Sequence, residues 1–189
     1  MTLPNVISIL RLACVPLFVW WLVDDRLLAA AALLAVLGAT DWVDGWIARH
    51  FDQGSDLGKV LDPVADRILL ITAGVALVVQ GSVPLVVGIL VLARELVVSV
   101  AVLTLAAAGA RRIDVQWAGK AGTLAVMFAF PLFLLADAID TGHGLVLFAA
   151  WCFAVVGLVL GYWVLVQYVP LARRALHEGR DAHSAAAAR

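Results

Sequence analysis

Charged residues are scarce in this chain of 189 residues. They make up 14% of the sequence, whereas soluble domains carry about 25%. Hydrophobic residues make up 64%, compared with about 45–50% in soluble proteins. This balance predicts a protein embedded in a membrane. The net charge of −1 provides no basic face to neutralise nucleic-acid phosphates, so we expect no nucleic-acid partner.

Cysteine is almost absent, and the two cysteines present form no recognisable site. Cys14 and Cys152 lie inside apolar runs, and their spacing fits no metal site, so we expect buried free thiols. The N-terminus lacks basic residues ahead of its first apolar run, and Arg11 interrupts that run. These features predict a retained membrane segment rather than a cleaved signal peptide.

Strand-like alternation is also missing, and long apolar stretches separated by polar breaks are present instead. Each stretch is close to the about 20 residues that a helix needs to cross a bilayer core of about 30 Å. Because lipid excludes open strand edges, we predict an all-α polytopic membrane protein with six transmembrane helices. The expected helices are at residues 6–23, 27–47, 61–80, 84–107, 118–137 and 145–169. The membrane domain would cover residues 1–176, and residues 177–189 would form a polar tail without regular structure.

Lysine and arginine are distributed unevenly over the predicted loops. With both termini on the cytoplasmic side, the outer loops contain only Arg26. The inner loops and the tail contain Arg49, Lys59, Arg111, Arg112, Lys120, Arg173, Arg174, Arg180 and Arg189. This positive-inside asymmetry predicts cytoplasmic termini and a polar active-site cavity open to the cytoplasm.

Four aspartates stand at short spacings around the second predicted loop. Asp41 and Asp44 are three residues apart, and Asp62 and Asp66 are four apart. On helices, both spacings place the pair on one face. The first pair ends the second predicted helix and the second pair opens the third, with a short polar link between them. We therefore expect the four carboxylates to converge at the cytoplasmic membrane surface.

Such a cluster is difficult to keep ionised without cations. Two carboxylates about 4 Å apart repel by roughly 4 kcal/mol at an effective dielectric constant of 20, and burial in the membrane costs about 2.5–3.5 kcal/mol per charge. Divalent ions bound by oxygen ligands relieve the repulsion, and two ions about 3.5–4 Å apart are used for in-line phosphoryl displacement. The cluster thus predicts two divalent metal ions. For any single aspartate, a core group or a helix cap is the alternative, and Asp62 before Pro63 fits an N-cap.

Small residues and an arginine accompany the aspartates. Gly45, Ala48 and Gly58 lie on or near the aspartate faces. Their short side chains let a pyrophosphate or a neighbouring backbone approach closely. Arg49 follows about one turn after Asp44 and can hold a phosphate or a ribose.

The stretch from Asp41 to Asp66 also resembles a known signature. The run D-x-x-D-G-x-x-A-R, eight residues, then G-x-x-x-D-x-x-x-D is similar to the CDP-alcohol phosphatidyltransferase family at every defined position. The resemblance implies that two Mg²⁺ or Mn²⁺ ions are held by Asp41, Asp44, Asp62 and Asp66. It also implies that Asp66 is the general base for the acceptor hydroxyl. The CDP pocket would be lined by Gly45, Ala48, Arg49 and Gly58.

The N-terminal stretch from Pro4 to Arg11 resembles the family's P-N-x-x-[ST]-x-x-R pattern. Asn5, Ser8 and Arg11 recur every three residues and therefore share a helix face. The resemblance implies contact with the CDP nucleotide, above all through Asn5 and Ser8. The alternative is a cap at the membrane interface, with Arg11 extending to the inner surface.

Further ionisable residues are candidates for the acceptor site. Arg94 and Glu95 lie near the middle of the fourth predicted helix, and intramembrane ionisable residues are functional by default. Arg94 is therefore a candidate for binding a substrate phosphate, and a structural ion pair is the alternative. Arg111, Arg112 and Lys120 can bind acceptor phosphate or anionic headgroups, although a plain positive-inside anchor also explains them.

The resemblance implies a homodimeric enzyme of phospholipid biosynthesis in a bacterial plasma membrane. It would transfer a phosphatidyl group from CDP-diacylglycerol to an alcohol and release CMP. Residues 61–67 and 93–95 resemble the branch that uses glycerol 3-phosphate, which is the expected acceptor, although Gly122 stands where that branch often has a second lysine. Residues 119–123 resemble actinobacterial cardiolipin synthases, so phosphatidylglycerol is the alternative. An ion-coupled transporter is a remote alternative, because its carboxylates would lie near the bilayer midplane.

Overall fold

The described part of the structure is almost entirely helical. A computed structural model describes the backbone of residues 3–50, 58–107 and 117–187, and the side chains of residues 8–40, 65–101 and 117–167. Within these ranges the chain forms helices joined by turns and contains no strand, so the all-α prediction is confirmed there. The helices are α1 (Leu3–Val23), α2 (Leu27–His50), α3 (Gly58–Gln80), α4 (Leu85–Ala107), α5 (Trp117–Ala138) and α6 (His143–Ala187).

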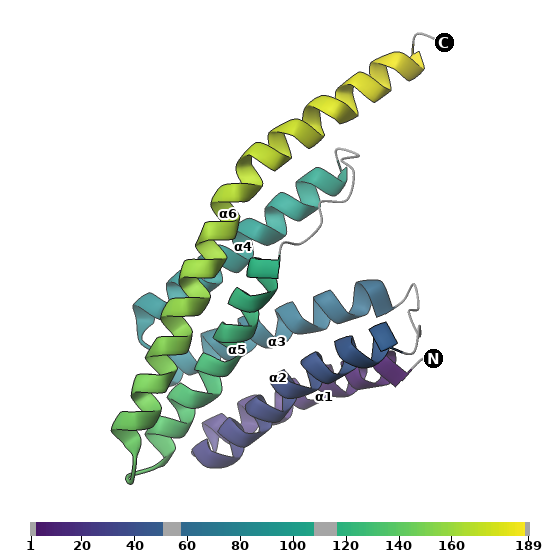
Figure 1. The fold of residues 1–189 in the computed structure, drawn as a ribbon. Helices are drawn as coiled ribbons and strands as arrows, with labels where there is room; N and C mark the ends of the chain where they lie inside the picture. The colour runs from purple at the N-terminus through teal and green to yellow at the C-terminus, as the bar shows by residue number, and fades with distance from the viewer. Residues whose placement is uncertain (1–2, 51–57, 108–116, 188–189) are drawn as a thin grey trace.

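Successive helices run in opposite directions along the bundle. Figure 1 shows the start of α1, the end of α2 and the start of α3 together at one end. The end of α4 and the start of α5 point to the same side, and α6 returns to that side and extends beyond its neighbours. The turns at the opposite end include Asp25 and Gly142, with positive φ angles of 57° and 81°. This order brings the backbone of both halves of the aspartate motif to one end of the bundle.

Helix α5 lies in the interior and α6 lies at the surface. Helix α5 packs against α2, α3 and α6, and its Phe130 and Leu134 are at most 1% exposed. On α6, by contrast, Val159, Trp163 and Val166 are 62%, 61% and 71% exposed. A row of apolar side chains as exposed as this is unfavourable in water. The surface of α6 is therefore suited to lipid surroundings.

Two helices with described side chains are long and apolar enough to cross a membrane. They are Trp117–Ala138, with a mean hydropathy of 1.8, and His143–Gln167, with a mean hydropathy of 2.4. The apolar segments Ser8–Val23 and Leu27–Thr40 are shorter within the described side chains. These lengths and compositions are consistent with a membrane protein, and the presence of six spans stays a prediction.

Glycines let α5 and α6 approach at backbone distance. A Cβ atom added at Gly157 would lie 2.7 Å from Val126 Cγ2 and 2.9 Å from the carbonyl oxygen of Gly122. A Cβ atom added at Gly122 would lie 3.0 Å from the amide nitrogen of Gly161. Because backbone atoms cannot move aside as a flexible side chain does, glycine is the residue that fits this contact.

We expect Gly157→Ala to destabilise the protein by about 1–3 kcal/mol, because the added methyl group forces α5 and α6 apart. Gly144→Ala, on the same helix, is the matched control, since nothing lies within 4 Å of an added Cβ atom there. Thermal unfolding of both variants in detergent micelles measures the difference. Identical unfolding midpoints for the two variants would contradict the close contact.

The C-terminal segment and the cysteines differ from the sequence-based expectations. Residues 177–189 are expected to lack regular structure, whereas α6 continues as a helix to Ala187. The alanine-rich composition of this segment favours helix, and its polarity alone does not oppose it. Cys152 is exposed rather than buried and Cys14 is half-buried, and both are free. The exposure of Cys152 follows from its place on α6, which leaves much of its surface uncovered.

Candidate active site

The buried face of α1 is polar near the start of the helix and apolar beyond it. Ser8, Arg11, Val15, Phe18 and Leu22 follow one another at spacings of three and four residues, and each is at most 8% exposed. These spacings define one face of a helix, and α1 packs against α2 and α3. The polar members, Ser8 and Arg11, lie toward the start of α1, at the end of the bundle where α2 ends and α3 begins (Figure 1).

Arg11 forms an ion pair with Asp66 of α3. Its Nη1 atom donates a hydrogen bond to Oδ1 of Asp66, and the two side chains are 1% and 27% exposed. A buried guanidinium is tolerated only with a partner, and the carboxylate supplies a charge-assisted hydrogen bond. The alternative interpretation, in which Arg11 extends to the inner membrane surface, therefore does not hold. The Asp66 carboxylate combines an enclosed cationic partner with partial access from outside.

The helical register relates the first aspartate pair to the core. Asp41 follows the buried Leu34 by seven residues, and Asp44 follows the buried Leu37 by seven. Seven residues are close to two helical turns. Both aspartates therefore occupy register positions in line with the buried face of α2.

The second aspartate pair belongs to the first turns of α3. That helix begins at Gly58, so Asp62 lies within it and is not its N-cap. Among the side chains that the structure describes, no group of three or more His, Cys, Asp or Glu residues could hold a metal ion. Of the four aspartates, however, only Asp66 has a described side chain, and the convergence of the others stays a prediction. The undescribed side chains are those of Asp41, Asp44 and Asp62.

The predicted CDP-binding residues are described only in part. Ser8 is 0% exposed, so in this structure its side chain presents no surface to a nucleotide. The backbone of the other predicted residues belongs to the ends of α1, α2 and α3 that meet in Figure 1. Their side chains or surroundings lie outside the described residues, and these residues are Asn5, Gly45, Ala48, Arg49 and Gly58. The binding of CDP therefore stays a prediction.

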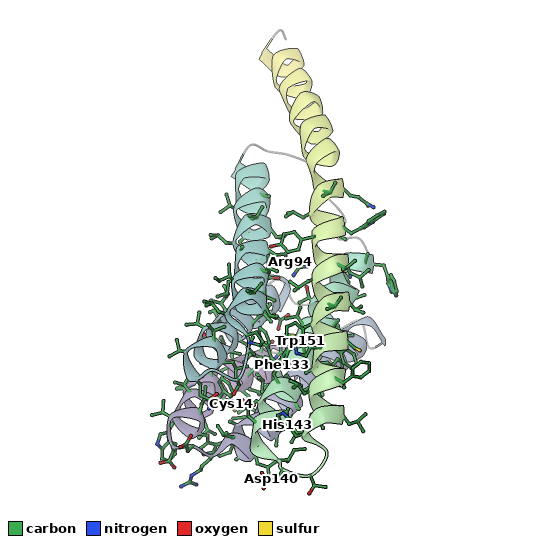
Figure 2. All side chains as sticks on the ribbon, turned by 90° about the vertical axis from the view of Figure 1, so that its left-hand side faces the viewer. Cys14, Arg94, Phe133, Asp140, His143 and Trp151 are labelled. Atoms are coloured by element: carbon green, nitrogen blue, oxygen red, sulfur yellow. The ribbon has the colours of Figure 1, made fainter. Side chains whose placement is uncertain are left out.

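A second buried polar cluster joins α4 to α5 and α6. Arg94 Nη1 donates hydrogen bonds to Glu95 Oε1 and, at 3.0 Å, to Thr123 Oγ1. Arg94 Nη2 donates to the carbonyl oxygen of Gly119 at 3.5 Å. A Cβ atom at Gly161 would lie 2.9 Å from Arg94 Nε, so the arginine passes directly over α6. Figure 2 shows Arg94 between α4 and α6.

These contacts agree with the structural interpretation of Arg94. The side chains of Arg94 and Glu95 are 11% and 6% exposed, and the arginine links three helices. Tyr162 adds another link, because its hydroxyl donates to the carbonyl oxygen of Leu90 at 2.9 Å and thereby ties α6 to α4. Binding of a substrate phosphate by Arg94 stays a prediction.

The other candidate acceptor residues lie near the start of α5. Lys120 is exposed in the first turn of that helix. Arg111 and Arg112 lie outside the described residues. The sequence did not reveal that Thr123 is a partner of Arg94. In the sequence, the feature that could have indicated it is the hydroxyl residue Thr123 one helical turn after Gly119. In the structure, the Thr123 hydroxyl donates to the carbonyl oxygen of Gly119 at 3.1 Å.

Comparisons with known proteins bear on the chemistry of this end of the bundle. Residues 1–163 match the family described as CDP-alcohol phosphatidyltransferase. The chain is 38% identical over 180 residues to cardiolipin synthase (CMP-forming) of Streptomyces coelicolor, covering 92% of this chain and 84% of that protein. It is 33% identical over 177 residues to CDP-diacylglycerol–glycerol-3-phosphate 3-phosphatidyltransferase of Pseudomonas fluorescens, covering 89% of each. The protein of that name from Haemophilus influenzae is 28% identical over 183 residues, covering 92% of this chain and 95% of that protein.

Proposed function

The chain belongs to the CDP-alcohol phosphatidyltransferase family, and from this premise we propose that it transfers a phosphatidyl group from CDP-diacylglycerol to phosphatidylglycerol. The products would be cardiolipin and CMP. The observation that carries the choice of acceptor is the larger identity to the Streptomyces cardiolipin synthase than to the two glycerol-3-phosphate enzymes. This reverses the order in which the sequence alone ranks the acceptors. Glycerol 3-phosphate is the second candidate, favoured by the nearly full-length match to those two enzymes.

Two divalent ions, Mg²⁺ or Mn²⁺, complete the proposed site on Asp41, Asp44, Asp62 and Asp66. Carboxylate oxygens are the ligands that these hard cations prefer. The backbone of α2 and α3 carries both aspartate pairs to one end of the bundle (Figure 1), and the Asp66 carboxylate is partly accessible. When bound, the ions would neutralise the pyrophosphate and the negative charge that develops on the leaving group.

Asp66 acts in this proposal as the general base. It takes the proton of the acceptor hydroxyl while the hydroxyl oxygen attacks the lipid-side phosphorus of CDP-diacylglycerol. A new oxygen–phosphorus bond forms, the pyrophosphate bond breaks, and CMP leaves with the electron pair. Arg49 on α2 holds the phosphate of the departing CMP. Gly45, Ala48 and Gly58 leave room for the pyrophosphate to approach the backbone.

The enzyme is proposed to cross a bacterial plasma membrane six times, with both termini and the active site in the cytoplasm. The antiparallel order of the helices supports this topology, because it returns the end of the chain to the side on which the chain begins (Figure 1). The positive-inside distribution of basic residues sets the orientation. CDP-diacylglycerol would then enter sideways from the bilayer, with its headgroup at the inner surface. A homodimer remains the expected assembly, which light scattering of the purified protein would measure.

A single assay tests the proposed function. Purified protein in mixed micelles receives CDP-diacylglycerol and Mn²⁺, with phosphatidylglycerol, glycerol 3-phosphate, inositol phosphate and serine offered in parallel. We expect CMP release and cardiolipin formation with phosphatidylglycerol, and loss of both in EDTA until Mn²⁺ or Mg²⁺ is restored. Turnover with glycerol 3-phosphate alone would select the second candidate. Absence of CMP release with every acceptor would contradict the function and favour the remote alternative of an ion-coupled transporter.

A further inference from the structure

The proposed general base is held by a helix that contributes none of the four aspartates. Arg11 of α1 donates from Nη1 to Oδ1 of Asp66 on α3. The arginine side chain is 1% exposed, whereas the aspartate side chain is 27% exposed. The cation is therefore enclosed by protein and directed at the carboxylate, while the carboxylate itself keeps a route to the outside.

The surroundings of Arg11 restrict how it can move. It lies on the buried face of α1 between Ser8, which is 0% exposed, and Val15, which is 8% exposed. A long side chain enclosed in this way cannot change rotamer without displacing its neighbours. The terminal torsion of an aspartate, by contrast, is broad and nearly twofold. A planar guanidinium fixed in place therefore selects one orientation of a carboxylate that would otherwise turn.

We propose that Arg11 is a positioning residue that fixes the Asp66 carboxylate for removal of the acceptor proton. This inference rests on the proposed function of Asp66 as the general base. A carboxylate offers about four lone-pair directions, and the hydrogen bond from Arg11 Nη1 to Oδ1 occupies one of them. Because its side chain is 1% exposed, Arg11 acts in this proposal through Asp66 rather than on CDP or the acceptor, which distinguishes this role from the nucleotide contact that the family resemblance implies.

The kinetic test compares Arg11→Gln and Arg11→Lys with Val15→Ala, which alters the same buried face of α1. CMP release is measured at saturating acceptor and Mn²⁺ while CDP-diacylglycerol is varied. We expect Arg11→Gln to lower kcat about 100-fold, the usual effect of misplacing a reacting group, with little change in KM for CDP-diacylglycerol. Arg11→Lys should recover part of kcat, because it keeps the charge and loses only the planar fork. Val15→Ala should keep kcat although its unfolding midpoint falls.

Three results would overturn the inference. A higher KM with unchanged kcat in Arg11→Gln would make Arg11 a nucleotide contact. A loss of kcat in Val15→Ala as large as that in Arg11→Gln would reduce the role of Arg11 to general support of the bundle. Wild-type kcat and KM in a folded Arg11→Gln protein would show that Asp66 is positioned without Arg11.

A second measurement needs neither metal nor substrate. The unfolding midpoints of the wild type, Arg11→Gln, Asp66→Asn and the double variant are compared in EDTA. We expect Arg11→Gln to lower the midpoint less in the Asp66→Asn background, because its partner is already altered. Equal shifts in both backgrounds would overturn the direct coupling. Wild-type turnover in Asp66→Asn would remove the proposed base role, whereas an inactive Asp66→Asn beside a fully active Arg11→Gln would remove only the positioning role.

Discussion

Replacement of Asp66 by asparagine is expected to reduce CMP release by about 10²–10⁴-fold, the usual contribution of a general base. Asparagine keeps the size of the side chain and one oxygen that can accept from Arg11, but it cannot take a proton from the acceptor hydroxyl. The fold should therefore persist while turnover falls. The measurement is the initial rate of CMP release from CDP-diacylglycerol at saturating acceptor and Mn²⁺, with the unfolding midpoint recorded for the same sample.

Asp140→Asn is the matched control for this substitution. Asp140 is exposed in the turn between α5 and α6, and Figure 2 shows it at the far end of the molecule from the C-terminal part of α6. The same change of charge there should leave the rate unaltered. Undiminished CMP release by a folded Asp66→Asn protein would rule out Asp66 as the base.

Removal of the Arg94 side chain is expected to give the largest loss of stability. The Glu95 side chain is only 6% exposed, and Arg94→Ala removes its cationic partner. Breaking a buried pair from one side costs about 3–5 kcal/mol. It also removes the hydrogen bonds to Thr123 and Gly119 that join α4 to α5. The free energy of unfolding can be measured by titrating the purified protein from mild detergent into dodecyl sulfate.

Two further variants distinguish the cost of breaking the Arg94–Glu95 ion pair from the cost of removing any arginine. Arg26→Ala removes an arginine whose pair with Asp24 is exposed, at 59% and 45% for the two side chains, so we expect a loss below about 1 kcal/mol. The double variant Arg94→Ala/Glu95→Ala should be more stable than Arg94→Ala, since no unpaired charge remains. A double variant less stable than Arg94→Ala would show that Glu95 stabilises the bundle without Arg94.

The positions of the first five helices could be predicted closely from the lengths of the apolar runs, whereas α6 continues well beyond its predicted run. The second run, predicted at residues 27–47, corresponds to α2 at Leu27–His50, and the fourth, predicted at 84–107, corresponds to α4 at Leu85–Ala107. This agreement has a physical cause. In an apolar environment the backbone satisfies its hydrogen bonds within the helix, so the length of an apolar run becomes the length of a helix.

The contacts between helices could not be predicted in the same way. Arg94 reaches Thr123 over a separation of 29 residues, and Arg11 reaches Asp66 over 55. Spacing rules relate side chains on one helix, whereas these pairs depend on which faces meet and how closely. The pairing of Arg94 with Glu95 could be predicted because the two residues are adjacent in the sequence. The close approach of Gly161 to Arg94 is seen only in the structure.

Helix α1 packs against both α2 and α3, the two helices that divide the aspartate motif between them. Phe18 on this helix is 0% exposed, so a larger side chain there would have to displace the neighbouring helices. The separation of the two halves of the motif therefore depends in part on the volume of apolar side chains of α1.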